Sequence, residues 1–202
     1  MTADPAGRAY DRAWHLLSDG DAATAARTLR DALARPALAP VDEADLRHLL
    51  GRALDALGDE EGMVREWMNV RRLDEELDPP APRLDPEEFE RRAAAALEEL
   101  PEELRERLKS VAIVIDGRPS AGMVRDGVDP RILGLYTGVP YPDRSVLGSG
   151  AFPEVIYLFS RNLEAEVEDD RELAEQIRIT VAHETAHYFG LDDDDLARLG
   201  LA

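Results

Sequence analysis

The distribution of apolar residues changes along the chain. Before about residue 80, helix-forming residues dominate and β-branched residues are scarce, so we expect helices there. After about residue 110, short runs of Val, Ile and Leu lie between loops that contain Gly and Pro, which is typical of strands. We expect a hinge at the proline-rich residues 78–82, because consecutive prolines stop a helix. The sequence therefore predicts a helical domain at residues 1–80 and a second domain at residues 81–202.

The predicted helical domain contains an internal repeat. Gly20-Asp21 recurs as Gly58-Asp59, 38 residues later, and each pair is followed by a predicted helix with apolar residues at matching positions. This order of helix, Gly-Asp turn and helix resembles the tetratricopeptide repeat, whose period is about 34 residues. The resemblance covers residues 5–77, and a proline-broken connector accommodates the extra length. It implies helical hairpins, which can bind a protein partner.

The tryptophans and histidines of this domain have simple structural interpretations. Trp14 and Trp67 lie in the predicted helices, where we expect both to pack between helices. His15 and His48 lack acidic or histidine partners at the spacing of metal ligands. We therefore expect both histidines on the surface of their helices.

The second domain is predicted to combine helices with a small mixed sheet. Asp85 and Pro86 are typical of the cap and the first position of a helix, which we expect to extend to about residue 100. The remaining predicted elements are a short helix at 101–109, strands at 111–115, 131–136 and 154–160, a Gly/Pro-rich loop at 137–152, a polar connection at 161–169 and a long helix at 170–189. Gly190 would end this last helix as a C-cap residue. The predicted fold class is α+β.

The last predicted helix contains the sequence His183-Glu184-Thr185-Ala186-His187, the H-E-x-x-H pattern. Histidines four positions apart lie on one face of a helix, so both imidazoles can reach the same point. Imidazole is a good zinc ligand, and the intervening carboxylate can take a proton from a metal-bound water. The motif therefore predicts His183 and His187 as metal ligands and Glu184 as general base. The alternative is a helical histidine pair without a metal.

A catalytic zinc site needs a third protein ligand beside the two histidines. The candidates after His187 are the four consecutive aspartates at residues 192–195. Asp193 completes the spacing H-E-x-x-H-x-x-G-x-x-D, in which Gly190 permits the chain to reverse toward the metal. We expect Asp193 to be the third ligand, with a neighbouring aspartate as the alternative. The same aspartates could instead cap a short terminal helix.

Residues 84–202 resemble the small bacterial zincin-like metallopeptidases with the H-E-x-x-H-x-x-G-x-x-D motif. The similarity extends beyond the motif to residues 85–89, 100–104, 133–140, 144–145 and 156–159. It implies a minimal zincin-like domain, with a small sheet and the metal helix last, that binds one Zn²⁺ per chain and acts as a peptidase. The metal ligands and base that the resemblance implies are His183, His187, Asp193 and Glu184. The helical segment in front departs from this family pattern.

The analogy with zincins also suggests where a substrate would bind. We expect the strand at residues 154–160 to be the edge strand above the cleft, where an extended peptide could pair with it. The tetrahedral intermediate of peptide hydrolysis needs stabilisation of its oxyanion. Tyr136, Tyr141 and Arg144 are candidates for this role, and ordinary packing or surface charge is the alternative for each.

Charge and composition exclude several classes of partner. The 202 residues include 24 Lys and Arg against 43 Asp and Glu, and the net charge of −19 repels nucleic acids and anionic membranes. Disulfides, thiol catalysis and thiolate metal sites are excluded because the chain has no Cys. No signal peptide and no run of 18 apolar residues are evident, so we expect a cytoplasmic protein that does not span a membrane.

These observations favour a zinc-dependent metallopeptidase that acts on a peptide or protein substrate, with the helical repeats as the site for a protein partner. One alternative is an interaction module whose zincin-like domain binds metal but is weakly active or inactive. Another is hydrolysis of a non-peptide amide or ester, because a metal-activated water is not restricted to peptide bonds.

Overall fold

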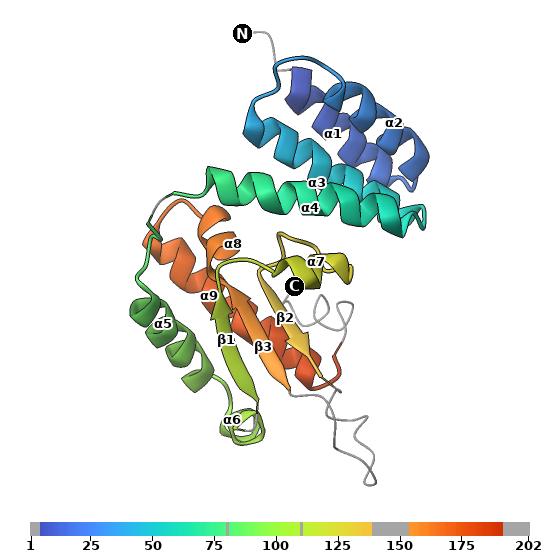
Figure 1. Cartoon of the computed structure of the whole chain (residues 1–202). Helices are drawn as coiled ribbons and strands as arrows, with labels where there is room; N and C mark the ends of the chain where they lie inside the picture. The colour runs from blue at the N-terminus through green and yellow to red at the C-terminus, as the bar shows by residue number, and fades with distance from the viewer. Residues whose placement is uncertain (1–4, 80, 110, 139–153, 192–202) are drawn as a thin grey trace. The chain divides into compact units, whose positions relative to one another are not determined.

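The computed structural model describes residues 5–79, 81–109, 111–138 and 154–191, which belong to two compact units (Figure 1). The helical unit consists of Met1–Pro79 together with Pro119–Arg131. The sheet unit consists of Pro80–Arg118 together with Ile132–Ala202. The helical unit therefore includes a short segment that lies, in sequence, between two strands of the sheet unit. None of the helices in the described residues is long and apolar enough to cross a membrane.

The helical unit consists of two consecutive helical hairpins and one short additional helix. Its elements are α1 (Pro5–Ser18), α2 (Ala22–Leu33), α3 (Pro40–Ala56), α4 (Glu60–Leu77) and α7 (Ala121–Arg125). The core is built from alanine and leucine side chains of α1, α2 and α3 together with Met63 and Trp67 of α4, and Val124 of α7 is fully buried in it. The alanines permit close approach of the helices, while the leucines supply most of the buried apolar area.

The two predicted Gly-Asp turns have the same local structure. Gly20 and Gly58 adopt the left-handed conformation, with φ of 83° and 73°, which glycine tolerates without steric cost. The aspartate after each glycine caps the next helix: Asp21 accepts the backbone N–H of Thr24, and Asp59 accepts that of Gly62. The repeat thus recurs in three dimensions at its turns. The tetratricopeptide assignment itself stays a prediction.

Trp67 packs between helices, as the sequence predicted. Its side chain is 5% exposed and lies against α3, where Gly51 leaves room for the indole ring. A Cβ atom at Gly51 would lie 2.1 Å from the indole nitrogen, so no larger residue fits at this position. The indole N–H points to the carbonyl oxygen of His48 at 3.4 Å.

The same prediction for Trp14 was wrong, because this side chain is 43% exposed. The buried face of α1 is formed by alanines, so the large indole ring lies outside the packed interface. Trp14 stacks on Tyr10 with ring centroids 6.5 Å apart, and the guanidinium of Arg52 lies 5.1 Å from the Trp14 ring centroid. The local contacts are therefore aromatic stacking and a cation–π interaction.

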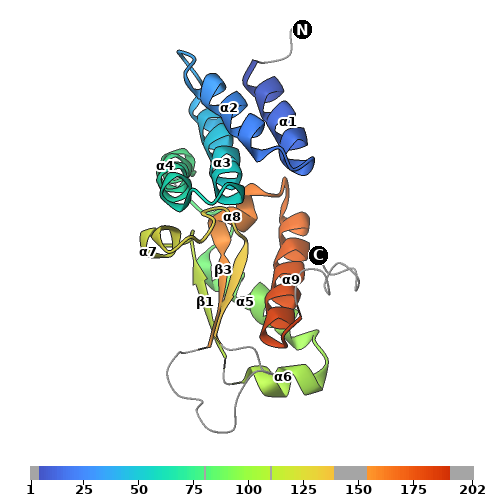
Figure 2. The same ribbon diagram turned by 90° about the vertical axis from the view of Figure 1, so that its right-hand side faces the viewer.

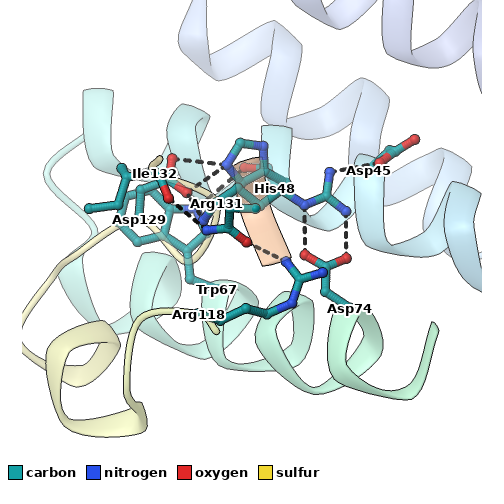
Figure 3. A network of polar contacts seen from close by, with 9 residues as sticks. Asp45, His48, Trp67, Asp74, Arg118, Asp129, Arg131 and Ile132 are labelled. Carbon is teal, nitrogen blue, oxygen red and sulfur yellow. Dashed lines mark hydrogen bonds and ion pairs between the residues drawn. The ribbon is translucent and has the colours of Figure 1, made fainter. Parts of the chain in front are cut away.

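The segment Pro119–Arg131 is held in the helical unit by ion pairs, one of them with the buried Asp74 (Figure 3). Arg131 donates two hydrogen bonds of 2.8 Å to the carboxylate of Asp74, and a third of 2.7 Å to Asp45. Burial alone would lower the pKa of Arg131, but the two carboxylates raise it above its ordinary value. The guanidinium therefore stays charged, and its planar fork fixes the end of the segment.

A second pair in this unit corrects the expectation for His48. Its Nε2 lies 2.8 Å from Oδ1 of Asp129, and the histidine side chain is only 15% exposed. Burial on its own would raise the pKa of Asp129, but the hydrogen bond and charge of His48 hold it below its ordinary value. The partner lies 81 residues away in sequence, which is why local spacing gave no sign of it.

The sheet unit contains a three-stranded mixed sheet with helices packed against it. Its elements are α5 (Pro86–Glu98), α6 (Glu102–Leu108), β1 (Ala112–Asp116), β2 (Gly134–Thr137), β3 (Val155–Phe159), α8 (Ser160–Ala165) and α9 (Asp170–Tyr188). Helix α9 runs along one face of the sheet (Figure 2). The core between them includes Ile156 and Leu158 of β3 with Ile177 and Val181 of α9. The described residues thus agree with an α+β fold.

The strand order corrects the expectation for residues 154–160. The order is β1-β3-β2, so β3 is the central strand, parallel to β1 and antiparallel to β2. Residues 154–160 therefore do not form the edge strand, and β2 is the antiparallel edge strand beside α9. The polar connection that was predicted after β3 contains the short helix α8, which was not among the predicted elements. A buried apolar run in the sequence does not reveal how many neighbours its strand has.

Two carbonyl groups just before β2, those of Ile132 and Leu133, accept hydrogen bonds that fix the chain there. The buried side chain of Asn162 accepts a hydrogen bond from Arg118 and donates one of 2.6 Å to the carbonyl oxygen of Ile132. The carbonyl oxygen of Leu133 accepts the N–H of Phe159 in β3 at 2.9 Å. Because hydrogen-bonding directions alternate along an antiparallel strand, the backbone groups of Gly134 and Tyr136 point away from β3.

Candidate metal centre

Helix α9 presents the H-E-x-x-H motif from a rigid position. It begins at a well-formed cap, in which the side chain of Asp169 accepts the backbone N–H groups of Arg171 and Glu172. Apolar residues spaced four apart bury one side of the helix: Leu173, Ile177 and Val181 are each at most 1% exposed. This packing fixes the rotation of the helix about its axis, and therefore the direction in which the motif residues point.

The two motif histidines converge at one point. The Nε2 atoms of His183 and His187 lie 3.0 Å apart, and their rings are nearly perpendicular, with centroids 4.6 Å apart. Both side chains are half-buried rather than covered. Two nitrogens at adjacent corners of a tetrahedral zinc site lie about 3.3 Å apart, because each Zn–N bond is about 2.05 Å. The observed separation is close to this value, so the pair fits a shared zinc ion.

The end of α9 sets the tautomer of His187. Its Nδ1 lies 3.0 Å from the carbonyl oxygen of Leu191. Since a carbonyl oxygen only accepts hydrogen bonds, the proton of the neutral ring resides on Nδ1 and the lone pair on Nε2, which faces His183. Hydrogen bonding of the other ring nitrogen to a backbone carbonyl is typical of histidines that bind metals. The arrangement therefore presents Nε2 of His187 as a ligand.

Gly190 produces the turn that brings Leu191 back to the helix. It adopts φ of 80°, as the sequence predicted for the residue that ends the helix. The N–H of Leu191 donates to the carbonyl oxygen of Ala186 at 3.1 Å, and that of Gly190 to His187 at 2.9 Å. These two bonds form a Schellman motif. The turn both closes the helix and places the carbonyl group that binds Nδ1 of His187.

The carboxylate of Glu184 is buried and held by the edge strand. The residue is 5% exposed, and its Oε2 accepts the backbone N–H of Tyr136 at 2.8 Å. This N–H points away from β3, so the strand fixes the glutamate without giving up its pairing with β3. Low surrounding dielectric strengthens the interactions of a carboxylate placed in this way.

Gly134 allows β2 to approach the helix this closely. A Cβ atom at this position would lie 2.7 Å from both Cγ and Oε1 of Glu184, and 2.8 Å from Cγ2 of Thr180. Such distances are shorter than any ordinary carbon contact. A glycine is therefore required where the strand crosses the motif.

The remaining predicted site residues are only partly placed. Tyr136 lies beside the motif: its ring makes an edge-on contact with Tyr188 at 5.7 Å between centroids. Asp193 with its neighbouring aspartates, Tyr141 and Arg144 lie outside the described residues. Within the described ranges, no group of three or more His, Cys, Asp or Glu side chains could hold a metal ion. The structure thus brings two predicted ligands and the predicted base together, and the third ligand stays a prediction.

Three features of this centre were missed by sequence reasoning. They are the backbone N–H of Tyr136 on Glu184, the close packing of Gly134, and the carbonyl oxygen of Leu191 on His187. Two of them are backbone groups, for which side-chain identity carries no signal. Gly134 offered a weak signal, because a glycine inside a strand pattern indicates a bulge or a close backbone approach.

The comparison with protein families agrees with this geometry. Residues 108–201 match the model of a family described as zincin-like metallopeptidase. The matched segment includes β1, β2, β3 and α9, and hence every described residue of the candidate centre. No curated protein was found to match the chain. The match supports a zincin-like metallopeptidase domain in this segment. It does not include α1 to α5, but it includes α7, which belongs to the helical unit.

Proposed function

We propose that the protein is a zinc-dependent metallopeptidase that holds one Zn²⁺ per chain with His183, His187 and Asp193. The observation that carries the proposal is the convergence of two imidazole Nε2 atoms, 3.0 Å apart, beside a buried glutamate. Zinc bound there would activate a water molecule and polarise a carbonyl group. The family match of the segment supports the same class of activity.

Glu184 is the group that would move the proton in this reaction. As general base it takes a proton from the attacking water, and it then delivers a proton to the departing amine. The hydrogen bond from Tyr136 to Oε2 orients the carboxylate, so less ordering remains to be done in the transition state. His187 is oriented in the same way through Leu191.

A peptide substrate would lie along β2 in this proposal, because β2 is the edge strand beside the motif. Extended peptides commonly add to a sheet edge, but the N–H of Tyr136 is already donated to Glu184, so a peptide could pair only with the remaining outward-facing backbone groups of β2. The side chains of Tyr136 and Arg144 are proposed to stabilise the oxyanion. The contact between Tyr136 and Tyr188 of α9 supports this for the tyrosine, since it keeps the ring beside the motif.

The test compares three proteins on a diverse peptide library: wild type, Glu184→Gln and Tyr136→Phe. Glu184→Gln keeps the shape of the side chain but removes the base, so we expect zinc binding to persist and cleavage to fall at least about 10²-fold. Tyr136→Phe retains the backbone N–H and tests the hydroxyl alone. Cleavage by Glu184→Gln at the wild-type rate would refute the assigned base. Zinc binding without cleavage of any peptide by wild type would refute the peptidase.

A further inference from the structure

The first helical hairpin carries a groove that plays no part in the proposed metal centre. The groove lies between α1 and α2 and has a volume of about 650 Å³. Four exposed arginines line it. Arg8 and Arg12 belong to α1, Arg27 belongs to α2, and Arg35 follows the end of α2. Among the described residues that line it, Asp31 is the only acidic one.

The positions of these arginines follow from helix geometry. Arg8 and Arg12 are four residues apart, so they lie on one face of α1, one turn from each other. Ala9 lies between them in sequence and is buried, which leaves a shallow floor. Thr24 and Thr28 of α2, half-buried and again four apart, line the groove as well. The groove therefore combines long, positively charged arginine side chains with a floor of small residues.

Three of the four groove arginines, all but Arg8, form no ion pair with a described carboxylate. Within the described part of the chain, none of the ion pairs involves Arg12, Arg27 or Arg35. Arg27 donates instead to the hydroxyl of Thr24 at 2.9 Å, and Arg35 to the carbonyl oxygen of Pro5 at 3.4 Å. Both acceptors are neutral groups, so neither hydrogen bond compensates the guanidinium charge.

This lack of carboxylates is notable because acidic residues are abundant in the chain. Arg47, by contrast, lies between two carboxylates, Glu43 at 2.8 Å and Glu66 at 2.6 Å. Residues 5–35 contain five arginines and four aspartates, whereas the chain as a whole has 24 basic against 43 acidic residues. Asp21, one of those four aspartates, accepts the N–H of Thr24 at the start of α2. With Asp4 included, residues 1–35 are balanced in formal charge, whereas the chain as a whole is strongly acidic.

We propose that this groove binds an acidic segment of a protein partner. The guanidinium group matches a carboxylate through two parallel hydrogen bonds, which a glutamate-rich or aspartate-rich peptide can repeat along its length. A 14-residue helix is roughly 21 Å long, which suits about six residues of extended peptide. A long polyanion such as a nucleic acid would extend beyond the groove over acidic surface, and the net charge would repel it.

This binding activity goes beyond the proposed peptidase and does not depend on it. Fluorescence anisotropy with the full chain tests it at about 50 mM salt, where charge interactions are weakly screened. The probes are labelled hexaglutamate, labelled hexaglutamine and a labelled hexathymidylate. The groove variant carries Arg12→Glu and Arg27→Glu. The control carries Arg65→Glu and Arg72→Glu on α4, two exposed positions that produce the same change of net charge.

We expect saturable binding of hexaglutamate and none of hexaglutamine. Each exposed ion pair changes an affinity by up to about fivefold, so the groove variant should bind at least about tenfold more weakly. The control variant should bind within about threefold of wild type. Absence of hexaglutamate binding, or equal losses in both variants, would overturn the proposal. Tighter binding of the oligonucleotide than of hexaglutamate would assign the groove to nucleic acid instead. Circular dichroism melting of both variants verifies that they are folded. If the groove variant is not folded, the double variant Arg12→Gln and Arg27→Gln replaces it.

Discussion

The backbone N–H of Tyr136 donates a 2.8 Å hydrogen bond to Oε2 of Glu184. This contact joins the edge strand β2 to the metal-binding motif on α9. Because the donor is a backbone group that points away from β3, the position of the carboxylate depends on the path of the strand and on no particular side chain at residue 136. The path is set in turn by Gly134, which lets the strand approach the helix.

Gly134→Ala should therefore disturb the centre directly. The added Cβ would lie 2.7 Å from Cγ of Glu184, so the strand and the glutamate must move apart. We expect a loss of about 1–3 kcal/mol in the free energy of unfolding, as for other overpacked sites, and a fall in peptidase activity. Urea denaturation and a peptide cleavage assay would measure the two effects.

Gly122→Ala is the matched control for this substitution. Its Cβ would meet the Ser120 hydroxyl at 3.6 Å, an ordinary contact, and Gly122 lies within α7. Alanine is favoured over glycine inside a helix by up to about 1 kcal/mol, so we expect no loss of stability. If Gly134→Ala lowered the free energy of unfolding no more than Gly122→Ala does, this result would contradict the close packing between β2 and Glu184.

Gly190→Ala should weaken metal binding through His187. The left-handed conformation at φ of 80° costs a residue with a Cβ about 1–2 kcal/mol. Relief of that strain would shift the carbonyl group of Leu191, which holds Nδ1 of His187. Loss of such a supporting hydrogen bond typically lowers metal affinity about 10–100-fold. Zinc titration against a competing chelator measures this affinity.

Gly58→Ala provides the comparison, because Gly58 has a similar φ of 73° but lies in the helical unit. It should cost similar stability and leave zinc affinity within about twofold of wild type. Equal zinc affinity in the Gly190 and Gly58 variants would show that the turn after α9 has no role in holding His187.

Several parts of this structure could be predicted from sequence because their signals are local. The cap at Asp85 accepts the backbone N–H of Glu88 and was indicated by residue type and position alone, and the helices after the two Gly-Asp turns were indicated by the repeat. The motif on α9 and the turn at Gly190 depend only on helix spacing and on one left-handed residue. The convergence of His183 and His187 needs no tertiary contact to be inferred.

The features that were missed or wrong depend on residues far apart in sequence. His48 contacts Asp129 across 81 residues, and Glu184 contacts Tyr136 across 48. The order of the strands is also non-local, because β3 is paired on both sides with segments that precede it in the chain. Trp14 shows a different limit: its helix buries alanines, so the largest apolar residue is left outside the core.

Arg131→Ala should destabilise the protein more than removal of an exposed arginine. It leaves Asp74, which is 7% exposed, without its fork of hydrogen bonds. We expect a loss of about 2–4 kcal/mol, below the full value for a buried pair because the Arg131 side chain is 25% exposed. Arg72→Ala, which breaks an exposed pair with Glu76, should cost less than about 1 kcal/mol. Equal losses in urea denaturation would contradict the proposed anchoring of Pro119–Arg131.

The pair of Asp129 with His48 should make stability depend on pH in the acid range. Because the pKa of Asp129 is lowered in the folded state, its contribution is fully present above the unfolded value of about 3.9. The contribution is lost as the pH falls through the lowered folded value. The difference in unfolding free energy between wild type and Asp129→Asn should thus be larger at about pH 5.5 than at about pH 3. A constant difference between these two pH values would contradict the ion pair.

The central claim is that the motif on α9 binds zinc, and metal content tests it most directly. Zinc content would be measured by elemental mass spectrometry on the purified, untagged wild type, His187→Ala and Glu184→Gln. Zinc is supplied first, and the excess zinc is then removed. We predict about one zinc per chain in wild type and in Glu184→Gln, and none in His187→Ala. No zinc in wild type, or the same content in His187→Ala, would contradict the account.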